Sequence, residues 1–534
     1  MCKRGTLAVM FLFFFPLVVE AGTTYVATTS QEIQSYTNIL EAGDTLLVQA
    51  GEYDLNWKIA YLGGTSSDWI VIANMGGDVV IRGTVYDNVV DVINCSYLYL
   101  KGFEITSTNT SFGIDGMKFK EVCNHVIIED CHIHDVTGVG IPANSDNIGY
   151  LTVRRCHIHD VSEGIYLGTQ DGSIAAHHCV IEWNWIHDTH PDKGIQIKRS
   201  SYLNTVQDNV LYNNDVGGVI VYKTDRPSSA DNNIVRRNVI WNAVEGIFAV
   251  GQTDIENNII FNCDYGINTR NYSNWGMEDL FIRNNTVYNC HTTCLMLNNW
   301  DMATGQMICV NNACYQDLLS KNAILAPYGR GPGIVDHNRH YGTCGISGSA
   351  LGNSADQEFI NPGIVPGTVN LYPQDNSTLR NAGTASYGVP NEDFNLLVRP
   401  VSEYWDIGAY EWSQSGNPGW QIQPGFKGGA IVQIEEGDAS TLIQPFMSQI
   451  YPNPFGSLTT IRYSLKKETP VNLKIYNIQG QLVRTLVDEI QTEGEHMIQW
   501  NGMNETGRPV AGGIYFFRLN ADQLVETRKV ILLK

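Results

Sequence analysis

The strongest constraint on the fold is a short pattern that returns about every twenty to thirty residues between Cys123 and Asp317. Its copies read IIEDCHIHD, LTVRRCHIHD, VIEWNWIHD, TVQDNVLYN, IVRRNVIWN, DIENNIIFN, FIRNNTVYN and ICVNNACYQ. When the copies are aligned, one column holds Cys131, Cys156, Asn184, Asn209, Asn238, Asn258, Asn285 and Asn312. A repeat of this period indicates a solenoid, in which each copy buries its apolar edge against its neighbours.

Within each copy the apolar residues alternate, which is the period of a β-strand. A glycine follows the copy and opens a second short strand, in the column Gly140, Gly164, Gly194, Gly218, Gly246 and Gly266. We expect the residues one and three places after the glycine to point inward, and those two and four places after it to point to water. Two strands and two turns per copy predict a coil of a parallel β-helix. Side-chain amides stacked about 4.8 Å apart can hydrogen-bond along the stack and satisfy polar groups in its turns.

Length and composition indicate more than one domain and a protein that leaves the cytoplasm. A chain of 534 residues is too long for one compact domain. Residues 1–21 have the basic start and short apolar run of a signal peptide, and no other stretch is apolar enough for a membrane span. The formal net charge of −21 disfavours nucleic acid or an anionic membrane as a partner. We expect a protein that is secreted or attached to the cell surface, and a monomer.

The β-helix is expected to fill residues 22–412. Residues 24–83 predict a strand and a short helix that cap the solenoid, because an open end would expose unpaired strand edges. The stretch GDTLLVQAGEY resembles the opening of many secreted right-handed β-helix proteins, and EYWDIGAYEW (403–412) resembles their DIGAYE ending. Residues 413–446 have the composition of a linker.

Residues 447–534 change character and predict an immunoglobulin-like β-sandwich, because alternating strands are separated by turn signals at regular spacing. The YPNPF opening, IYNIQGQLVRTL, WNGMNETGRPVAGGIYFFRL and the basic last strand resemble the C-terminal sorting domain of the type IX secretion system of Bacteroidetes-type bacteria. That resemblance implies export across the outer membrane, with the secretion machinery as a partner. The expected fold is therefore all-β, a right-handed parallel β-helix followed by a small sandwich.

Eleven of the 12 cysteines follow the signal segment. Cys131 and Cys156 share a column, as do Cys263 and Cys290, which puts each pair on adjacent coils. We interpret them as buried thiols that fill core positions, and the expected oxidising compartment leaves disulfides as the alternative. No CxxC pair has metal-type spacing, and we assign no metal ligand.

The candidate binding surface is the outward side of the strands that follow the glycines. Aromatic, amide and basic side chains there suit a polysaccharide, which stacks on rings and bonds to polar groups. The expected substrate-binding residues are Tyr166, Gln196, Tyr222, Phe248 and Arg270.

Lys198 is the expected catalytic residue. The segment KGIQIKRSSYLNTVQDN locally resembles the chondroitinase B and alginate lyase group of β-helix lyases. In that family a lysine removes the C5 proton of a uronic acid and an arginine on the next coil assists, which implies Arg226 or Lys223 as the assisting cation here. The chemistry needs such a pair, because a proton beside a carboxylate is weakly acidic until a cation neutralises the carboxylate.

The same resemblance bears on cofactors. That family holds a calcium ion with acidic and amide side chains just ahead of the lysine, whereas GIQI carries no acid and places Gln196 there. The cofactor is therefore left undecided, with calcium as one alternative that has no defined ligand set.

Two other patterns bear on chemistry. Glu163 and Asp192 precede their glycines on successive coils and offer a carboxylate pair for glycoside hydrolysis. His134, His159 and His187, each followed by an aspartate, invite a metal site. Their column continues with Tyr212, Trp241, Phe261, Tyr288 and Tyr315, which favours a stack of side chains over a metal site.

The sequence thus favours a lyase that cleaves an extracellular uronic-acid polymer by β-elimination. A surface protein that binds glycan along the same face without cleaving it, and a β-helix glycoside hydrolase, are the alternatives.

Overall fold

The structure is a computed structural model that describes residues 22–226, 228–400, 404–414, 416–417, 419–427, 446–451, 459–465, 469–477, 481–492, 494–521 and 524–532. The expected signal peptide lies outside these residues. The chain divides into two compact units, residues 1–427 and residues 428–534.

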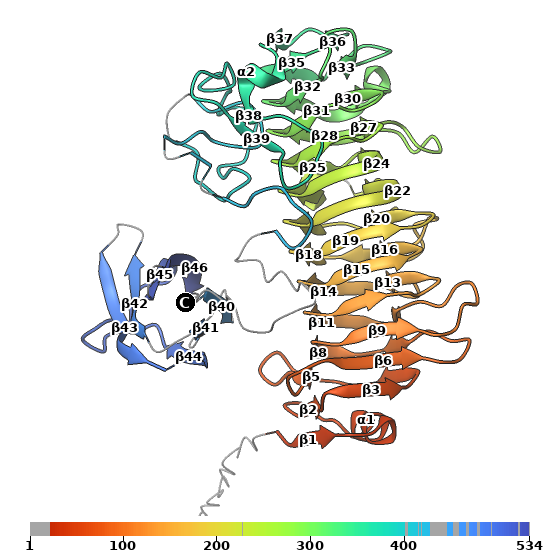
Figure 1. The fold of residues 1–534 in the computed structure, drawn as a ribbon, viewed down its shortest axis with the longest axis vertical. Coiled ribbons are helices and arrows are strands. Elements are labelled where there is room, and N and C mark those ends of the chain that lie inside the picture. Colours follow the sequence, from red (N-terminus) through yellow and green to blue (C-terminus); the bar gives the residue numbers. More distant parts are fainter. Residues whose placement is uncertain are drawn as a thin grey trace, which may run out of the picture. The chain divides into compact units, whose positions relative to one another are not determined.

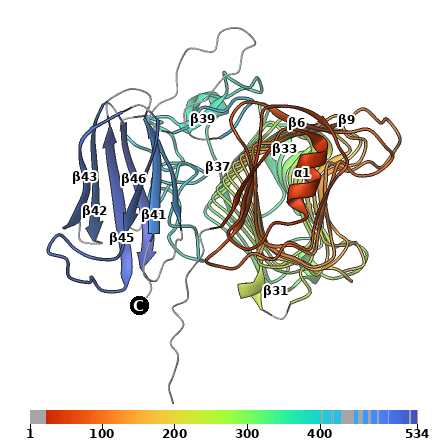
Figure 2. The same ribbon diagram turned by 90° about the horizontal axis from the view of Figure 1, so that it is seen from below.

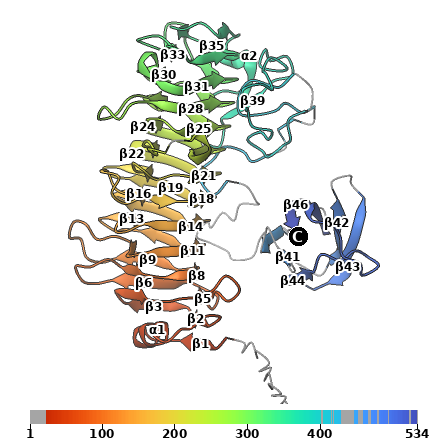
Figure 3. The ribbon, with the colours of Figure 1, turned by 180° about the vertical axis from the view of Figure 1, so that it is seen from behind.

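The first unit is a parallel β-helix, as predicted, in which successive coils stack from β1 to β37 (Figure 1). One side of every coil belongs to sheet A, which is also visible in Figure 3. Its strands are β1 (Thr24–Ala27), β2 (Thr45–Val48), β5 (Ile70–Asn74), β8 (Ser96–Lys101), β11 (Cys123–Glu129), β14 (Ile148–Arg154), β17 (Ala176–His177), β18 (Val180–Glu182), β21 (Thr205–Gln207), β23 (Asn233–Arg236), β25 (Thr253–Glu256), β28 (Glu278–Arg283), β31 (Thr304–Val310) and β34 (Ile334–Asp336).

The rest of each coil belongs to sheet B, which has two arms. The first arm contains β3 (Gly51–Asp54), β6 (Val79–Gly83), β9 (Glu104–Ser107), β12 (His132–His134), β15 (His157–Val161), β19 (Trp185–Thr189), β26 (Ile259–Phe261), β29 (Thr286–Tyr288), β32 (Ala313–Tyr315), β35 (Asn338–Tyr341) and β37 (Ser349–Leu351). The second arm contains β4 (Trp57–Ala60), β7 (Val90–Ile93), β10 (Met117–Lys120), β13 (Val139–Ala143), β16 (Glu163–Leu167), β20 (Lys193–Ile197), β27 (Tyr265–Thr269), β30 (Thr293–Leu297), β33 (Asn322–Leu325) and β36 (Thr343–Cys344). Two long strands, β22 (Val210–Val221) and β24 (Val239–Ala249), run through both arms and join them.

Each coil turns its corners at residues with left-handed backbone. Between sheet A and the first arm φ lies between +48° and +58°, at Asp130, Arg155, Trp183, Asp208, Arg237, Asn257, Asn284, Asn311 and His337. Between the two arms φ lies between +49° and +55°, at Asp135, Asp160, Asp188, Asn213, Asn242, Asn262 and Asn289. Aspartate and asparagine tolerate this region better than most residues with a Cβ, which accounts for the aspartate after each histidine of the repeat.

The asparagine column forms the predicted hydrogen-bonded ladder. The Oδ1 atom of Asn238 accepts hydrogen bonds from the backbone N of Asn209 at 3.0 Å and from its Nδ2 at 2.9 Å. In turn, the Nδ2 atom of Asn238 donates to Asn258 Oδ1 at 3.0 Å and to the carbonyl of Val206 at 2.9 Å. The same bonds continue to Asn338, one coil beyond the aligned copies. Every coil from Asn184 onward is therefore registered on the next.

The glycine column marks a close approach of neighbouring coils. A Cβ on Gly164 would lie 2.3 Å from the carbonyl oxygen of Gly194, and one on Gly246 would lie 2.4 Å from that of Gly266. Neither contact is possible for a real Cβ, so the column excludes all other residues. The residues one and three places later, such as Ile165 and Leu167, are fully buried as predicted.

Both ends and one face of the β-helix carry additional chain. At the N-terminal end, α1 (Ser30–Thr37) lies across the coils (Figure 2), and Thr37 accepts a hydrogen bond from Trp57 Nε1 at 3.1 Å. At the other end follow α2 (Ala355–Glu358) and the antiparallel pair β38 (Phe359–Asn361) and β39 (Asn370–Pro373). Short 3₁₀ turns occur at Ser229–Asp231 and Trp300–Met302.

The chain after β37 returns along the outward face of the first arm. Buried residues on both sides form one cluster, with Val210, Val239, Trp241, Ile259 and Phe261 on the strands and Leu371, Tyr372, Phe394, Tyr410 and Ile422 on the returning segment. Lys427 ends this segment, and its Nζ donates to Asp208 Oδ1 at 2.7 Å. Ile422 and Lys427, which lie in the segment expected to be linker, are thus packed into the first unit.

The cysteines are buried thiols, as interpreted from the sequence. Among the described residues eleven cysteines are free, and all except Cys344 are buried. Cys131 and Cys156 occupy the two ladder positions before Asn184, where the column starts with thiols in place of amides.

The second unit is the predicted immunoglobulin-like sandwich. One sheet contains β40 (Phe446–Tyr451), β41 (Thr459–Leu465) and β44 (Gly494–Trp500), and the other contains β42 (Thr469–Asn477), β43 (Leu482–Gln491), β45 (Gly513–Ala521) and β46 (Leu524–Leu532), all antiparallel. Its core includes Tyr463, Leu473, Trp500 and Phe517. Within the described residues, no helix has the length and apolar character that a membrane span needs.

We predict that Asn238→Ala lowers the urea midpoint of the β-helix. The change removes the acceptor of the buried backbone N–H of Asn209, at a cost of roughly 1–3 kcal/mol. Unfolding followed by circular dichroism measures the effect. Asn376→Ala, at an exposed asparagine, is the control and should leave the midpoint unchanged. Equal midpoints for the two variants would contradict a stabilising ladder.

Candidate functional site

The candidate site lies on the outward side of the second arm, where β16, β20 and β22 are adjacent. The register pairs Tyr166 with Gln196 and Gln196 with Ile220. Lys198 follows two places after Gln196, on the same side, and its backbone N donates to the carbonyl of Leu167 at 2.9 Å. Three successive coils therefore bring their outward residues together.

Lys198 is the centre of this arrangement. Its Nζ donates to Gln170 Oε1 at 2.9 Å and lies 4.8 Å from the ring centroid of Tyr166 and 5.2 Å from that of Tyr222. These four residues and Gln196 form what we call the Lys198 cluster. The lysine is 6% exposed, and burial lowers its pKa to about 8, an effect that the charge of Lys193 increases and that of Glu163 opposes.

Glu163 is a second titratable group of this face. It is 4% exposed, and burial, together with the charge of Asp192, raises the pKa of its carboxyl to about 8. Asp192 itself forms an ion pair with Lys193. At neutral pH the outward face thus holds a protonated carboxyl close to a lysine of reduced basicity.

Several oxygens on this face are buried without a hydrogen-bond partner. They are Glu163 Oε1, Gln196 Oε1, Glu245 Oε2 and Asn268 Oδ1. Buried polar atoms are almost always paired in folded proteins, so these oxygens call for donors from bound water or from a ligand.

The residues two and four places after the glycines do point outward, but loops cover them. Ile220, Tyr222, Phe248 and Val250 are buried as one apolar cluster, so the prediction that this side faces water is wrong for them. Over Tyr222 lie Tyr272 and Trp275, with ring centroids 5.1 and 5.6 Å away. Gln170 Nε2 reaches from another loop to the Tyr272 hydroxyl, at 3.4 Å. These loop contacts follow no repeat, so no sequence pattern pointed to Gln170 or Tyr272.

The expected assisting cations have other partners. The guanidinium of Arg226 lies 3.7 Å from the ring centroid of Tyr202. The Nζ atom of Lys223 forms an ion pair with Glu278 at 2.8 Å and donates to the carbonyl of Trp275 at 3.2 Å. Of the three expected catalytic residues, the Lys198 cluster includes Lys198 alone, and the lysine whose charge acts on it is Lys193, which sequence reasoning missed.

The expected binding residues lie on one face in two register columns, with Tyr166, Gln196 and Phe248 in one and Tyr222 and Arg270 in the other. Tyr166, Gln196 and Tyr222 belong to the Lys198 cluster, and Gln196 Nε2 lies 3.5 Å from the Tyr222 hydroxyl. Farther along the face, Phe248 contacts Tyr222 edge to face, and the guanidinium of Arg270 lies 5.1 Å from the Phe248 ring centroid.

The histidines form the predicted side-chain stack. Ring centroids are 5.2 Å apart from His134 to His159, 4.9 Å from His159 to His187 and 4.8 Å from His187 to Tyr212. A second column, His132, His157 and Trp185, stacks beside it with nearly parallel rings.

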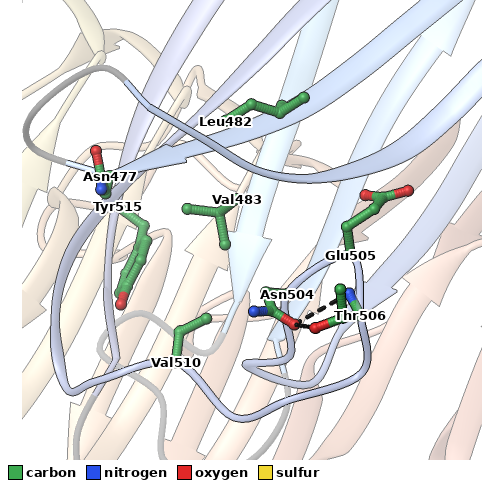
Figure 4. A pocket seen from close by; sticks show the side chains of 8 residues that line it. All are labelled: Asn477, Leu482, Val483, Asn504, Glu505, Thr506, Val510 and Tyr515. Atoms are coloured by element: carbon green, nitrogen blue, oxygen red, sulfur yellow. Dashed lines mark hydrogen bonds between the residues drawn. The ribbon is translucent and has the colours of Figure 1, made fainter.

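The second unit has a hollow of its own, with a volume of about 310 Å³ (Figure 4). Asn504 on its wall accepts hydrogen bonds from the backbone N and the hydroxyl of Thr506, at 3.1 and 2.9 Å. Glu505 accepts one from the backbone N of Thr485 at 2.9 Å. These groups stabilise turns of the sandwich, and we assign no chemistry to them.

Comparison with known families fits both units. The family model described as "Right handed beta helix region" matches residues 70–235, and the one described as "FlgD Ig-like domain" matches residues 455–524. The right-handed β-helix and the immunoglobulin-like sandwich are thereby confirmed, while the sorting function of the second unit stays a prediction. No curated protein matches the sequence.

Several solved structures are similar to the chain. An alginate lyase from Paenibacillus sp. str. FPU-7 is 18% identical, with 48% of this chain and 95% of the lyase covered and a TM-score of 0.40. Pectate lyase Pel9A is 15% identical, with 71% of this chain and 90% of the lyase covered and a TM-score of 0.41. The A-module of mannuronan C-5 epimerase AlgE6 from Azotobacter vinelandii is 14% identical, with 61% of this chain and 96% of the module covered and a TM-score of 0.43. At such low identity the likeness shows the fold alone.

We predict that Glu163→Gln raises the urea midpoint at pH 9 and leaves it nearly unchanged at pH 5. The folded chain holds this proton up to about pH 8, whereas the unfolded chain releases it near the ordinary pKa of 4.5. Rising pH therefore favours the unfolded native chain between these values, by about 1.4 kcal/mol for each pKa unit. Glutamine has no proton to lose.

Exposed Glu41→Gln is the control and should show no such pH dependence. A Glu163→Gln effect of the same size at both pH values would mean that the carboxyl is not held protonated.

Proposed function

We propose that the β-helix binds an anionic polysaccharide along the outward face of its second arm and cleaves it by β-elimination, with Lys198 as the base. The main support for this proposal is the environment of Lys198. Its ammonium lies among Tyr166, Gln170 and Tyr222, and burial lowers its pKa to about 8. A fraction of such a lysine is uncharged in neutral solution and can accept a proton.

The unpaired oxygens support a hydroxyl-rich ligand. Glu163 and Gln196 lie toward one end of the face, and Glu245 and Asn268 toward the other. From β16 to β27 the face crosses four strand spacings, or about 19 Å, which is enough for several sugar units in an extended chain. Hydroxyl groups of the polymer would donate to these oxygens.

Charge supports a ligand with carboxylates. The chain has a formal net charge of −21, and general repulsion would keep a polyanion away. On this face, however, Lys193 and Lys198 lie at the two ends of β20, and Arg270 follows β27, three strands farther along. Lys193, once released from its ion pair with Asp192, would neutralise the carboxylate at the reacting sugar, the role that the sequence suggested for Arg226 or Lys223.

The proposed reaction moves one proton to the base and one to the leaving group. The uncharged Nζ of Lys198 takes the proton from the carbon beside the carboxylate. The electron pair of that C–H bond becomes the carbon–carbon double bond, and the glycosidic C–O bond breaks. The leaving oxygen receives a proton from Glu163, whose raised pKa keeps it protonated at neutral pH. Gln170 must move to admit the substrate, because it caps the ammonium.

We predict that Lys198→Ala and Lys198→Arg both reduce cleavage roughly 10²–10⁴-fold, the usual contribution of a general base. Arginine keeps the positive charge but cannot give up its proton, so Lys198→Arg should still bind polymer in affinity gels. Lys223→Ala is the control and should retain activity, since its ammonium is paired with Glu278. The assay is the ultraviolet absorbance of unsaturated products from alginate, pectate and chondroitin. If none of these polymers gives an absorbance rise, with or without calcium, the lyase proposal is wrong.

The pH profile of kcat/KM is expected to be a bell with its maximum near pH 8. Activity rises as Lys198 loses its proton and falls as Glu163 loses its own, and both pKa values lie at about 8. A rate that declines steadily from pH 6 to pH 9 would contradict the assigned base.

A hydrolase is the second candidate, because a protonated Glu163 beside the carboxylate of Asp192 is the pairing that an acid-catalysed glycosidase uses. Reducing ends released without ultraviolet absorbance, and lost in Glu163→Gln and Asp192→Asn, would favour it. Binding without any product would favour the glycan-binding alternative.

We also propose that the protein acts outside the cell, where such polymers occur. The support is the leader-like composition of residues 1–21 and the sorting-domain resemblance of residues 447–534. Deletion of residues 447–534 in a bacterium with type IX secretion should retain the β-helix in the periplasm. Unchanged release into the medium would contradict sorting by this segment.

A further inference from the structure

We propose that Glu104, His132, His134 and His159 bind one Zn²⁺ ion on the outward face of the first arm. This site is separate from the Lys198 cluster and independent of the proposed lyase activity. It joins three consecutive coils, because β9, β12 and β15 are neighbours in the first arm.

Three imidazoles already meet at this place. One ligand atom from each of His132, His134 and His159 lies within 4.8 Å of the other two. The Nε2 atoms of His132 and His159 are 2.8 Å apart, and the Nε2 atom of His134 is 3.2 Å from Glu104 Oε1. Two nitrogen ligands of a tetrahedral zinc ion, with Zn–N bonds of about 2.0–2.1 Å, lie about 3.3 Å apart. Small ring movements therefore suffice to admit the ion.

The carboxylates after the histidines orient the rings for this role. Nδ1 of His134 donates to Asp135 at 2.8 Å, and Nδ1 of His159 donates to Asp160 at 2.6 Å. For His159 this bond places the proton on Nδ1 and leaves a lone pair on Nε2, the arrangement of a carboxylate–histidine–zinc unit. Nε2 of His134 donates to Glu104 in the metal-free chain, so zinc has to replace the proton of this bond. His132 then donates its Nε2 proton to His159, and on zinc binding this proton moves to Nδ1 of His132. The proton between His134 and Glu104 is released to solvent.

Stacking alone does not account for these residues. In the first column Trp185 follows His157, and in the second column Tyr212 follows His187, and these rings stack without an imidazole nitrogen. Histidines fill both columns only in the coils of β12 and β15, and Glu104 lies directly before them. The side chains of His134 and His159 are 15% and 18% exposed, so an ion from solution can reach them. Imidazole with one carboxylate suits zinc better than calcium, which takes oxygen ligands.

Calorimetric titration of the metal-free full chain with Zn²⁺ tests the proposal. We expect one ion per chain and a urea midpoint that rises with zinc concentration, because binding favours the folded state. His159→Gln should weaken binding more than 100-fold, and Asp160→Asn should weaken it about 10–100-fold through the orientation of His159. His291→Gln removes an exposed His–Asp pair outside the stack and should leave binding unchanged.

Co²⁺ provides a measurement on the native chain that does not depend on the folding of any variant. Tetrahedral coordination should give the intense visible absorption of that geometry, which Zn²⁺ then displaces in equal amount. A chain that takes up no Zn²⁺, shows no such Co²⁺ spectrum, or binds zinc as well in His159→Gln as in His291→Gln would overturn the proposal.

Discussion

The structure depends on the registration of one coil on the next through buried amides. Each asparagine of the ladder accepts two hydrogen bonds from the coil before it and donates to the coil after it. The atoms involved are fully buried, so a slipped coil would leave several polar groups without partners, which is far costlier than a small loss of apolar contact. From Asn184 onward the ladder therefore determines which outward residues become neighbours, and the juxtaposition of Gln196 and Lys198 with Tyr222 follows from it.

The Lys198 cluster shows how this scaffold alters ordinary side chains. A lysine on an exposed strand would stay charged up to its usual pKa. Here the aromatic rings of Tyr166 and Tyr222 and the loop residue Gln170 remove it from water. Burial likewise raises the pKa of the Glu163 carboxyl. Burial, more than any single charge, gives this face an acid and a base that titrate near neutrality.

The repeat pattern alone predicted the parallel β-helix, the amide ladder, the inward residues after each glycine and the histidine stack. Those predictions held because each depends on spacing within one coil. The helper role of Arg226 depended on a loop, and the structure places its guanidinium on Tyr202 instead. Gln170 and Tyr272 also come from loops without a repeat, so their contact across the face could not be read from the sequence. The repeat also identified Glu163 and the histidines as candidate site residues. It did not identify the neighbouring side chains that determine their protonation and possible metal binding.

The glycine and asparagine columns make a whole coil the natural unit of length change. An inserted coil with both columns would meet identical surfaces above and below, so the tube could grow without disturbing its interior. The position of the insertion decides what is lost. Between β16 and β20 it would separate Tyr166 from Lys198, and between β12 and β15 it would separate His132 from His159. A related chain with one extra coil at any other position could keep both sites. A related chain with the extra coil between β16 and β20, or between β12 and β15, is expected to have lost one of them.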